Sequence, residues 1–133
     1  MVLPSKHISI SIKASPTLTY GYTANPENLP HWAAGLSSGI RREGESWVTD
    51  SPMGKVRVNF SEKNDFGILD HTVTMPTGEK VLNPMRVLPN DDGSEVVFTL
   101  FQRKGISAQE FEADEILIED DLKRLKKNLE KIH

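Results

Sequence analysis

The chain has 133 residues, the usual size of one domain, and it carries 16 basic and 19 acidic side chains, a formal charge of -3. No run of Lys or Arg predicts a strip that could follow a phosphate backbone, so nucleic acid is not an expected partner. The absence of cysteine excludes disulfides and thiolate chemistry, and no apolar run reaches membrane-spanning length. We therefore expect a single cytoplasmic domain over residues 1–133, with no membrane insertion.

The first quarter of the chain predicts a strand followed by two short helices. The segment HISISIK, residues 7–13, alternates isoleucine with polar residues, which is the period of a strand with one wet face. Ser15 followed by Pro16 is a helix N-cap signal, the Asn-Pro pair at residues 25–26 breaks the chain, and Pro30 can open a second helix.

Residues 39–103 predict β-structure throughout. Turn-like segments rich in Gly, Pro, Asn and Asp separate strand-length runs: REGE, DSPMG, EKND, MPTGEK and PNDDGS. This punctuation indicates six more strands in an antiparallel meander. Ser107 and Glu110 then form a capping box, and apolar residues recur at helical spacing as far as Ile132, which predicts one long C-terminal helix.

Together these elements predict an α+β fold. We expect one curved antiparallel sheet of seven strands, whose apolar face is covered by the long C-terminal helix. The two short helices come between the first and second strands, so we expect them to close one end of the sheet. A grip of this kind encloses a cavity between sheet and helix.

The order of elements, together with ASP and YGYTANPENLPHW after the first strand, resembles the SRPBCC superfamily of helix-grip proteins. This group includes START lipid-transfer domains, Bet v 1-like allergens and polyketide cyclases. The stretch NDFGILDHTV, residues 64–73, is similar to one in small bacterial polyketide-cyclase-like members. The resemblance covers nearly the whole chain and implies the helix-grip fold, but it permits more than one chemistry.

Strand alternation decides which way His71 points. In its strand Leu69, His71 and Val73 share the more apolar face, and Asp70 lies on the opposite face. Asp70 therefore cannot orient His71 as the carboxylate of a catalytic triad does. We expect Asp70 to be a solvated residue of the outer face, paired with Arg86.

The turns predict which residues line the interior with His71. A three-residue turn within PTGE sets His71 opposite Met85 and Val73 opposite Asn83. A four-residue NDDG loop then sets Met85 opposite Phe98. The two loops agree in turning the apolar faces inward, which supports the register.

These positions form a candidate ligand site. His71 is interpreted equally as a core histidine, satisfied by Asn83 or a carbonyl, and as a ligand contact; acid–base catalysis comes third. Trp47 is expected to point into the cavity or to cover its mouth, and Trp32 to be a lid or core aromatic. The candidate ligand-binding residues are Leu69, His71, Val73, Asn83, Met85, Phe98, Trp47 and Trp32.

Two classes of function remain. The four histidines lie in different elements without metal-ligand spacing, and no phosphate loop, nucleophile elbow or Rossmann fingerprint occurs, so we expect no metal and no cofactor. The first class is a module that binds a small hydrophobic, aromatic or lipid-like molecule. The second is a cyclase or dehydratase-type enzyme in which His71 transfers a proton. The first is favoured because only one titratable residue is expected to point inward.

A third possibility is a protein-interaction role, like that of the chaperone co-factors that share this fold. Such a role would need an exposed apolar strip, which the sequence pattern does not predict. The pattern carries no signal for an oligomeric state.

Overall fold

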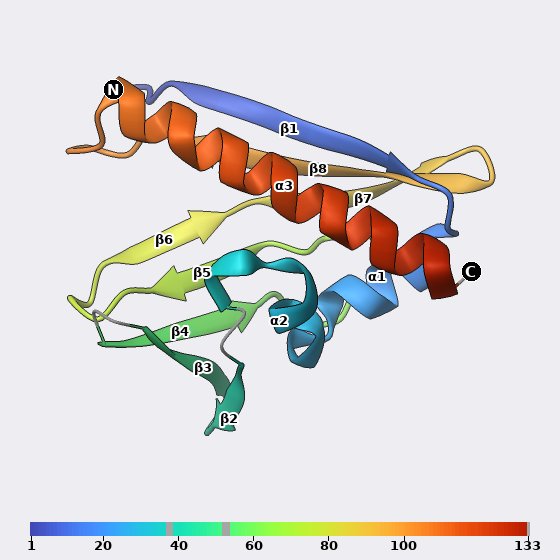
Figure 1. Cartoon of the computed structure of the whole chain (residues 1–133), viewed down its shortest axis with the longest axis horizontal. Coiled ribbons are helices and arrows are strands. Elements are labelled where there is room, and N and C mark those ends of the chain that lie inside the picture. Colours follow the sequence, from blue (N-terminus) through green and yellow to red (C-terminus); the bar gives the residue numbers. More distant parts are fainter. Residues whose placement is uncertain (37–38, 52–53, 133) are drawn as a thin grey trace.

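The structure is a computed structural model, which describes residues 1–36, 39–51 and 54–132. The described chain starts with a strand, continues with short helices and a run of consecutive strands, and closes with a long helix, the order expected for an α+β fold (Figure 1). The elements are β1 (Ser5–Ile12), α1 (Pro16–Ala24), η1 (Pro26–Asn28), α2 (Leu29–Trp32), η2 (Ala34–Leu36), β2 (Arg41–Glu43), β3 (Ser46–Ser51), β4 (Gly54–Phe60), β5 (His71–Thr74), β6 (Lys80–Asn83), β7 (Met85–Asn90), β8 (Gly93–Phe101) and α3 (Ala108–Ile132).

The strands form two antiparallel sheets, so the prediction of one seven-stranded sheet is wrong. The described strands pair in the orders β1-β8-β7 and β2-β3-β4-β5-β6. The expected sixth strand is divided into β6 and β7 by Pro84. Proline has no N–H to donate to a neighbouring strand, so the hydrogen-bonded ladder is interrupted at this residue.

The two sheets meet just before β5. Ile68 forms an isolated bridge with Arg86 of β7, and the Leu69 N–H donates to the Met85 carbonyl over 2.8 Å. The predicted strand that contains His71 is therefore regular only from His71 to Thr74. The result is one strongly curved surface that changes from one sheet to the other beside His71.

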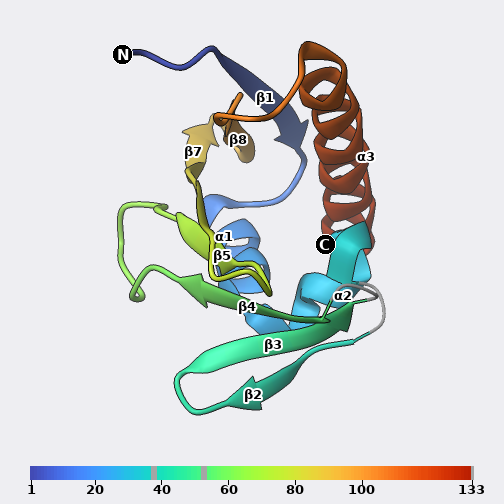
Figure 2. The ribbon, with the colours of Figure 1, turned by 90° about the vertical axis from the view of Figure 1, so that its left-hand side faces the viewer.

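The long helix α3 begins with the predicted capping box. The Ser107 hydroxyl accepts the Glu110 N–H at 3.0 Å, and the Glu110 carboxylate accepts the Ser107 N–H at 3.3 Å. The helix packs on β1 and on α2, and Figure 2 shows it alongside β1, with β2 and β3 further away. Its buried residues are Phe111, Leu122, Leu125 and Leu129.

Apolar residues also remain exposed on α3. Ile116 and Leu117 are 53% and 57% exposed, a feature that the sequence pattern did not predict. None of the described helices is long and apolar enough to span a membrane.

The short helices lie beside the C-terminal half of α3, at one end of the molecule (Figure 1). The Ser15 hydroxyl accepts the Leu18 N–H at 3.2 Å, which confirms Ser15 as the N-cap of α1. Helix α1 packs against β7 and β8, and α2 packs against α3. Leu29 and Trp32 of α2 are buried in the same apolar core as β1, β7, β8 and α3.

Candidate functional site

His71 lies in the apolar interior, as expected from strand alternation. It is 8% exposed, and its ring centroid lies 4.9 Å from that of Phe60 and 6.1 Å from that of Phe98. Its Nδ1 lies 3.0 Å from the carbonyl oxygen of Leu69. Because a carbonyl can only accept, Nδ1 carries the proton, and in the neutral ring Nε2 is left as an acceptor.

The surroundings of His71 favour its neutral form. Burial lowers the pKa of His71 because the charged imidazolium is poorly solvated in the interior. The hydrogen bond to Leu69 and the charge of Asp70 act in the opposite direction but are smaller. The ring is therefore uncharged near pH 7, and its single N–H, at Nδ1, already donates to the Leu69 carbonyl.

The partner predicted for His71 across the sheet is wrong by two residues. His71 pairs with Asn83 instead of Met85, and Val73 pairs with Val81 instead of Asn83. A shift of two residues leaves every side chain on its expected face. His71 and Asn83 are thus direct neighbours, although the Nδ1 proton goes to the Leu69 carbonyl.

The two-residue shift in the pairing of His71 comes from the position of the turn between β5 and β6. The loop has three residues, 76–78, as expected, but it lies one residue earlier than predicted: the Met75 N–H donates to the Glu79 carbonyl at 2.8 Å, and Gly78 has φ +92°. The next turn keeps the predicted register, because Met85 pairs with Phe98, but Asn90 pairs with Gly93, so the turn is shorter than the predicted four-residue loop.

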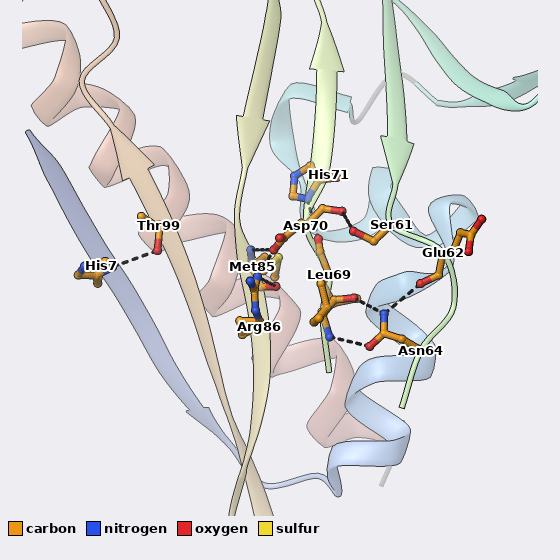
Figure 3. A network of polar contacts seen from close by, with 11 residues as sticks. His7, Ser61, Glu62, Asn64, Leu69, Asp70, His71, Met85, Arg86 and Thr99 are labelled. Carbon is orange, nitrogen blue, oxygen red and sulfur yellow. Dashed lines mark hydrogen bonds and ion pairs between the residues drawn. The ribbon is translucent and has the colours of Figure 1, made fainter. Parts of the chain in front are cut away.

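Asp70 is not the solvated residue that was predicted. Its Oδ1 accepts the backbone N–H of Met85 at 2.9 Å and forms the expected ion pair with Arg86, and its side chain is 25% exposed (Figure 3). The ladder partner that would stand opposite Asp70 is Pro84, which has no N–H. The Asp70 carboxylate therefore replaces backbone pairing where the sheet is interrupted.

The structure places both tryptophans on the inner side. Trp47 pairs with Val58, which pairs with Val73, so the three share the inward face, and Trp47 is half-buried. Part of the loop after β3, residues 52–53, lies outside the described residues. Trp32 is 4% exposed and belongs to the core, and its buried Nε1 has no hydrogen-bond partner among the described residues.

Three polar side chains of α3 hold the backbone around Trp32. We call Asp121, Arg124 and Asn128 the α2 strap. The contacts are Asp121 Oδ1 with the Ala34 N–H (3.1 Å), Arg124 Nε with the Trp32 carbonyl (3.1 Å) and Asn128 Nδ2 with the His31 carbonyl (3.0 Å). Sequence reasoning missed the strap, although its residues form one helical stripe beside the apolar one.

The histidines do not gather into a metal site. His7 contacts Thr99 at 3.0 Å and lies apart from His71 (Figure 3). His71 is buried, and His133 lies outside the described residues. Over residues 1–36, 39–51 and 54–132, no group of three His, Asp or Glu side chains is placed to hold a metal ion.

Comparison with known proteins bears on the fold. A conserved protein from Geobacillus kaustophilus is 15% identical with a TM-score of 0.76, covering 98% of this chain and 97% of its own. A START superfamily protein from Mycobacterium smegmatis is 10% identical with a TM-score of 0.73, covering 97% and 99%. The Bet v 1 allergen Ara h 8.0201 is 14% identical with a TM-score of 0.68, covering 98% of both chains. The chain has the helix-grip fold.

The resemblance to the SRPBCC superfamily is thus confirmed at the level of the fold. No protein-family model matches the sequence, and no curated protein sequence matches it.

The inward apolar side chains between the sheets and α3 differ in how far they are buried. Several inward side chains are fully buried, among them Leu69, Met85 and Leu125. Toward the β5–β6 turn and the middle of α3, four inward apolar side chains are only half-buried: Val73, Val81, Leu100 and Ile118. We call these four residues the open end.

Two surface hollows lie outside the helix-grip interior. One of about 340 Å³ is lined by residues of β4 and of the β5–β6 turn, and one of about 370 Å³ by the β7–β8 turn and the end of β1. Neither is lined by a residue of the candidate ligand-binding set. Among the candidate residues, Asn83 pairs with His71 across the sheet, the Leu69 carbonyl binds its Nδ1, and the Phe98 ring centroid lies 6.1 Å from that of His71.

Proposed function

We propose that the protein binds a small hydrophobic molecule, aromatic or lipid-like, between the sheets and α3. The observation that carries the proposal is the His71 imidazole, which is 8% exposed and in ring contact with both Phe60 and Phe98. Its Nδ1 is used on the Leu69 carbonyl, which leaves Nε2 as the acceptor of the neutral ring. Ligand pockets combine apolar walls with a few polar groups that fix orientation, and His71 is such a group.

The open end supports a route for the ligand. Val73 and Val81 belong to the sheet and Ile118 to α3, so the half-buried side chains stand on both sides of the interior. Half-buried apolar side chains keep part of their surface in contact with water. A bound apolar molecule would cover that surface and so complete their burial. Trp47 adds an aromatic surface on the same inward face.

The helix-grip proteins that this chain resembles include START lipid-transfer domains, which supports a hydrophobic ligand. Its structural neighbours include a START superfamily protein and a Bet v 1 allergen. A cyclase or dehydratase reaction would need a second group for proton transfer. Among the described buried residues His71 is the one titratable side chain, because the others are Thr19, Thr23, Thr49 and Ser94.

Two measurements test the proposal. Native mass spectrometry of the protein purified from its own host should show a bound molecule that organic solvent removes. In an NMR titration of the protein freed of that molecule, 2-naphthol should move the resonances of His71 and Asn83 together and leave exposed His7 unmoved. A titration in which His71 stays still, or moves only with the surface residues, would rule out binding in the interior.

A further inference from the structure

Trp32 carries a buried hydrogen-bond donor that nothing in the described chain satisfies. The side chain is 4% exposed, and its Nε1 has no partner among residues 1–36, 39–51 and 54–132. Native proteins pair the great majority of their buried polar groups, so each exception calls for a specific explanation. An indole N–H can only donate, so whatever satisfies it must be an acceptor.

The α2 strap keeps this donor in the interior. Arg124 binds the carbonyl of Trp32 itself, and Asn128 binds that of the preceding residue. Asp121 accepts the amide two residues further on, so the backbone is held on both sides of the indole. The strap thus uses polar side chains of α3 to fix the backbone of α2 and leaves the indole N–H unpaired.

The surroundings of Trp32 indicate that the acceptor is uncharged. The core cluster that contains it is made of apolar residues, and the buried polar residues of the described chain include no Lys or Arg. The cation bound to its carbonyl, Arg124, is already paired with Asp121. A buried anion without a cation would be strongly disfavoured, whereas a ketone, ester or ether oxygen needs only the hydrogen bond.

We infer that the ligand of this protein is an uncharged apolar molecule bearing an oxygen acceptor, such as a carbonyl, which binds the N–H of Trp32. This inference rests on the proposed function, and it narrows the class of ligand from any apolar molecule to an oxygenated one. His71 Nε2, an acceptor in the same core, would suit a hydroxyl elsewhere on such a molecule.

A matched pair of probes tests the inference. 2-Acetonaphthone and 2-isopropenylnaphthalene have nearly the same shape, but only the ketone has an oxygen acceptor. Their affinities are measured by calorimetry for the wild type and for Trp32→Phe, which keeps an aromatic ring without the N–H. We expect the ketone-to-alkene affinity ratio to fall about two- to tenfold in the variant, the range of one neutral hydrogen bond.

Tyr20→Phe is the control variant. It also deletes one polar atom from an aromatic ring, but the Tyr20 hydroxyl already accepts the Asn64 N–H at 3.1 Å. The affinity ratio should therefore be the same in Tyr20→Phe as in the wild type.

A measurement on the wild type covers the case in which Trp32→Phe does not fold. In ¹⁵N-labelled protein, the ketone should shift the indole N–H proton of Trp32 downfield, and the alkene should not. If both probes bind but the ratio and the indole shift do not distinguish them, the inference is wrong and the proposed function stands. If neither probe binds, both are wrong.

Discussion

The side chain of Asp70 accepts a hydrogen bond that a backbone carbonyl would accept in a regular sheet. Its carboxylate accepts the Met85 N–H at the point where Pro84 interrupts the ladder, and its own carbonyl accepts the Ser61 N–H at 2.8 Å. A side chain that satisfies a backbone amide in this way is hard to replace, because removal leaves the amide unpaired. The adjacent acid and imidazole thus have separate roles: Asp70 supports the sheet, and His71 faces the interior.

We predict that Asp70→Ala lowers the free energy of unfolding by about 1–3 kcal/mol, because the Met85 N–H loses its acceptor. Asp70→Asn should cost less, since an amide oxygen can still accept and a partly exposed ion pair contributes only about 0–1 kcal/mol. Urea denaturation of the two variants measures the difference. Equal losses in both would show that the ion pair with Arg86, and not the backbone contact, stabilises this site.

The buried imidazole predicts a pH dependence. Because burial lowers the pKa of His71 below the ordinary value of 6.5, the unfolded chain takes up this proton before the folded chain does. Stability is therefore fully present above about pH 6.5 and is lost as the pH falls below that value, toward the folded-state pKa.

An NMR titration measures the His71 pKa directly, with His7 and His31 as internal references. Chemical denaturation from pH 7.5 to pH 5 should show the loss of stability, and His71→Leu should show less of it. A His71 pKa above 6.5 would contradict the prediction and point to a buried carboxylate nearby.

At the level of elements, α3 supplies one wall of the interior. Leu125 is fully buried, whereas Leu117 on the same helix is 57% exposed. We predict that Leu125→Ala destabilises the fold by about 2–5 kcal/mol through lost burial and a cavity. Leu117→Ala should change stability by no more than about 0.5 kcal/mol. Urea titration of the pair checks this, and similar losses would mean that α3 packs differently from the described arrangement.

The α2 strap makes a second prediction at this level. Asp121→Ala removes the acceptor of the Ala34 N–H, and hydrogen bonds to charged groups are among the stronger ones. Amide exchange at Ala34 should become about tenfold faster or more. The Ala33 amide, which donates to the Leu29 carbonyl at 2.8 Å, is the control. Unchanged exchange at Ala34, or equal acceleration at both amides, would show that the strap does not act on this residue.

For the whole molecule, the joint between the two sheets is the decisive feature. Gly67 accepts the Val87 N–H at 2.9 Å, and it has φ +72°. A Cβ at Gly67 would lie 2.2 Å from the Val87 carbonyl oxygen, so the two chains could not approach as they do. The curvature that surrounds the interior therefore depends on one glycine beside one interrupted ladder.

Gly67→Ala is predicted to destabilise the protein by about 2 kcal/mol or more, from backbone strain and the clash. The control is Gly21→Ala in α1, where a Cβ would meet nothing within 4 Å. That change should instead stabilise the protein by up to about 1 kcal/mol, because alanine favours a helix interior. Thermal unfolding of both variants measures the contrast, and a neutral Gly67→Ala would mean that the sheets can separate at this joint.

Local signals in the sequence determined the order and type of the elements and the inward face of His71. The capping box at Ser107, the N-cap at Ser15 and the alternation in β1 act over a few residues, so they can be interpreted without knowing the fold. Even the error in the pairing of His71 preserved its face, because the side-chain period of a strand is two.

Only the tertiary structure decided the division into two sheets, the role of Asp70 and the unpaired N–H of Trp32. Each depends on groups far apart in the chain: Asp70 and Met85 are separated by 15 residues, and Arg124 and Trp32 by 92. Propensities and turn motifs describe neighbours in sequence, whereas satisfaction of a buried donor depends on every segment that packs around it. The candidate site is therefore defined by what surrounds His71 and Trp32 in space.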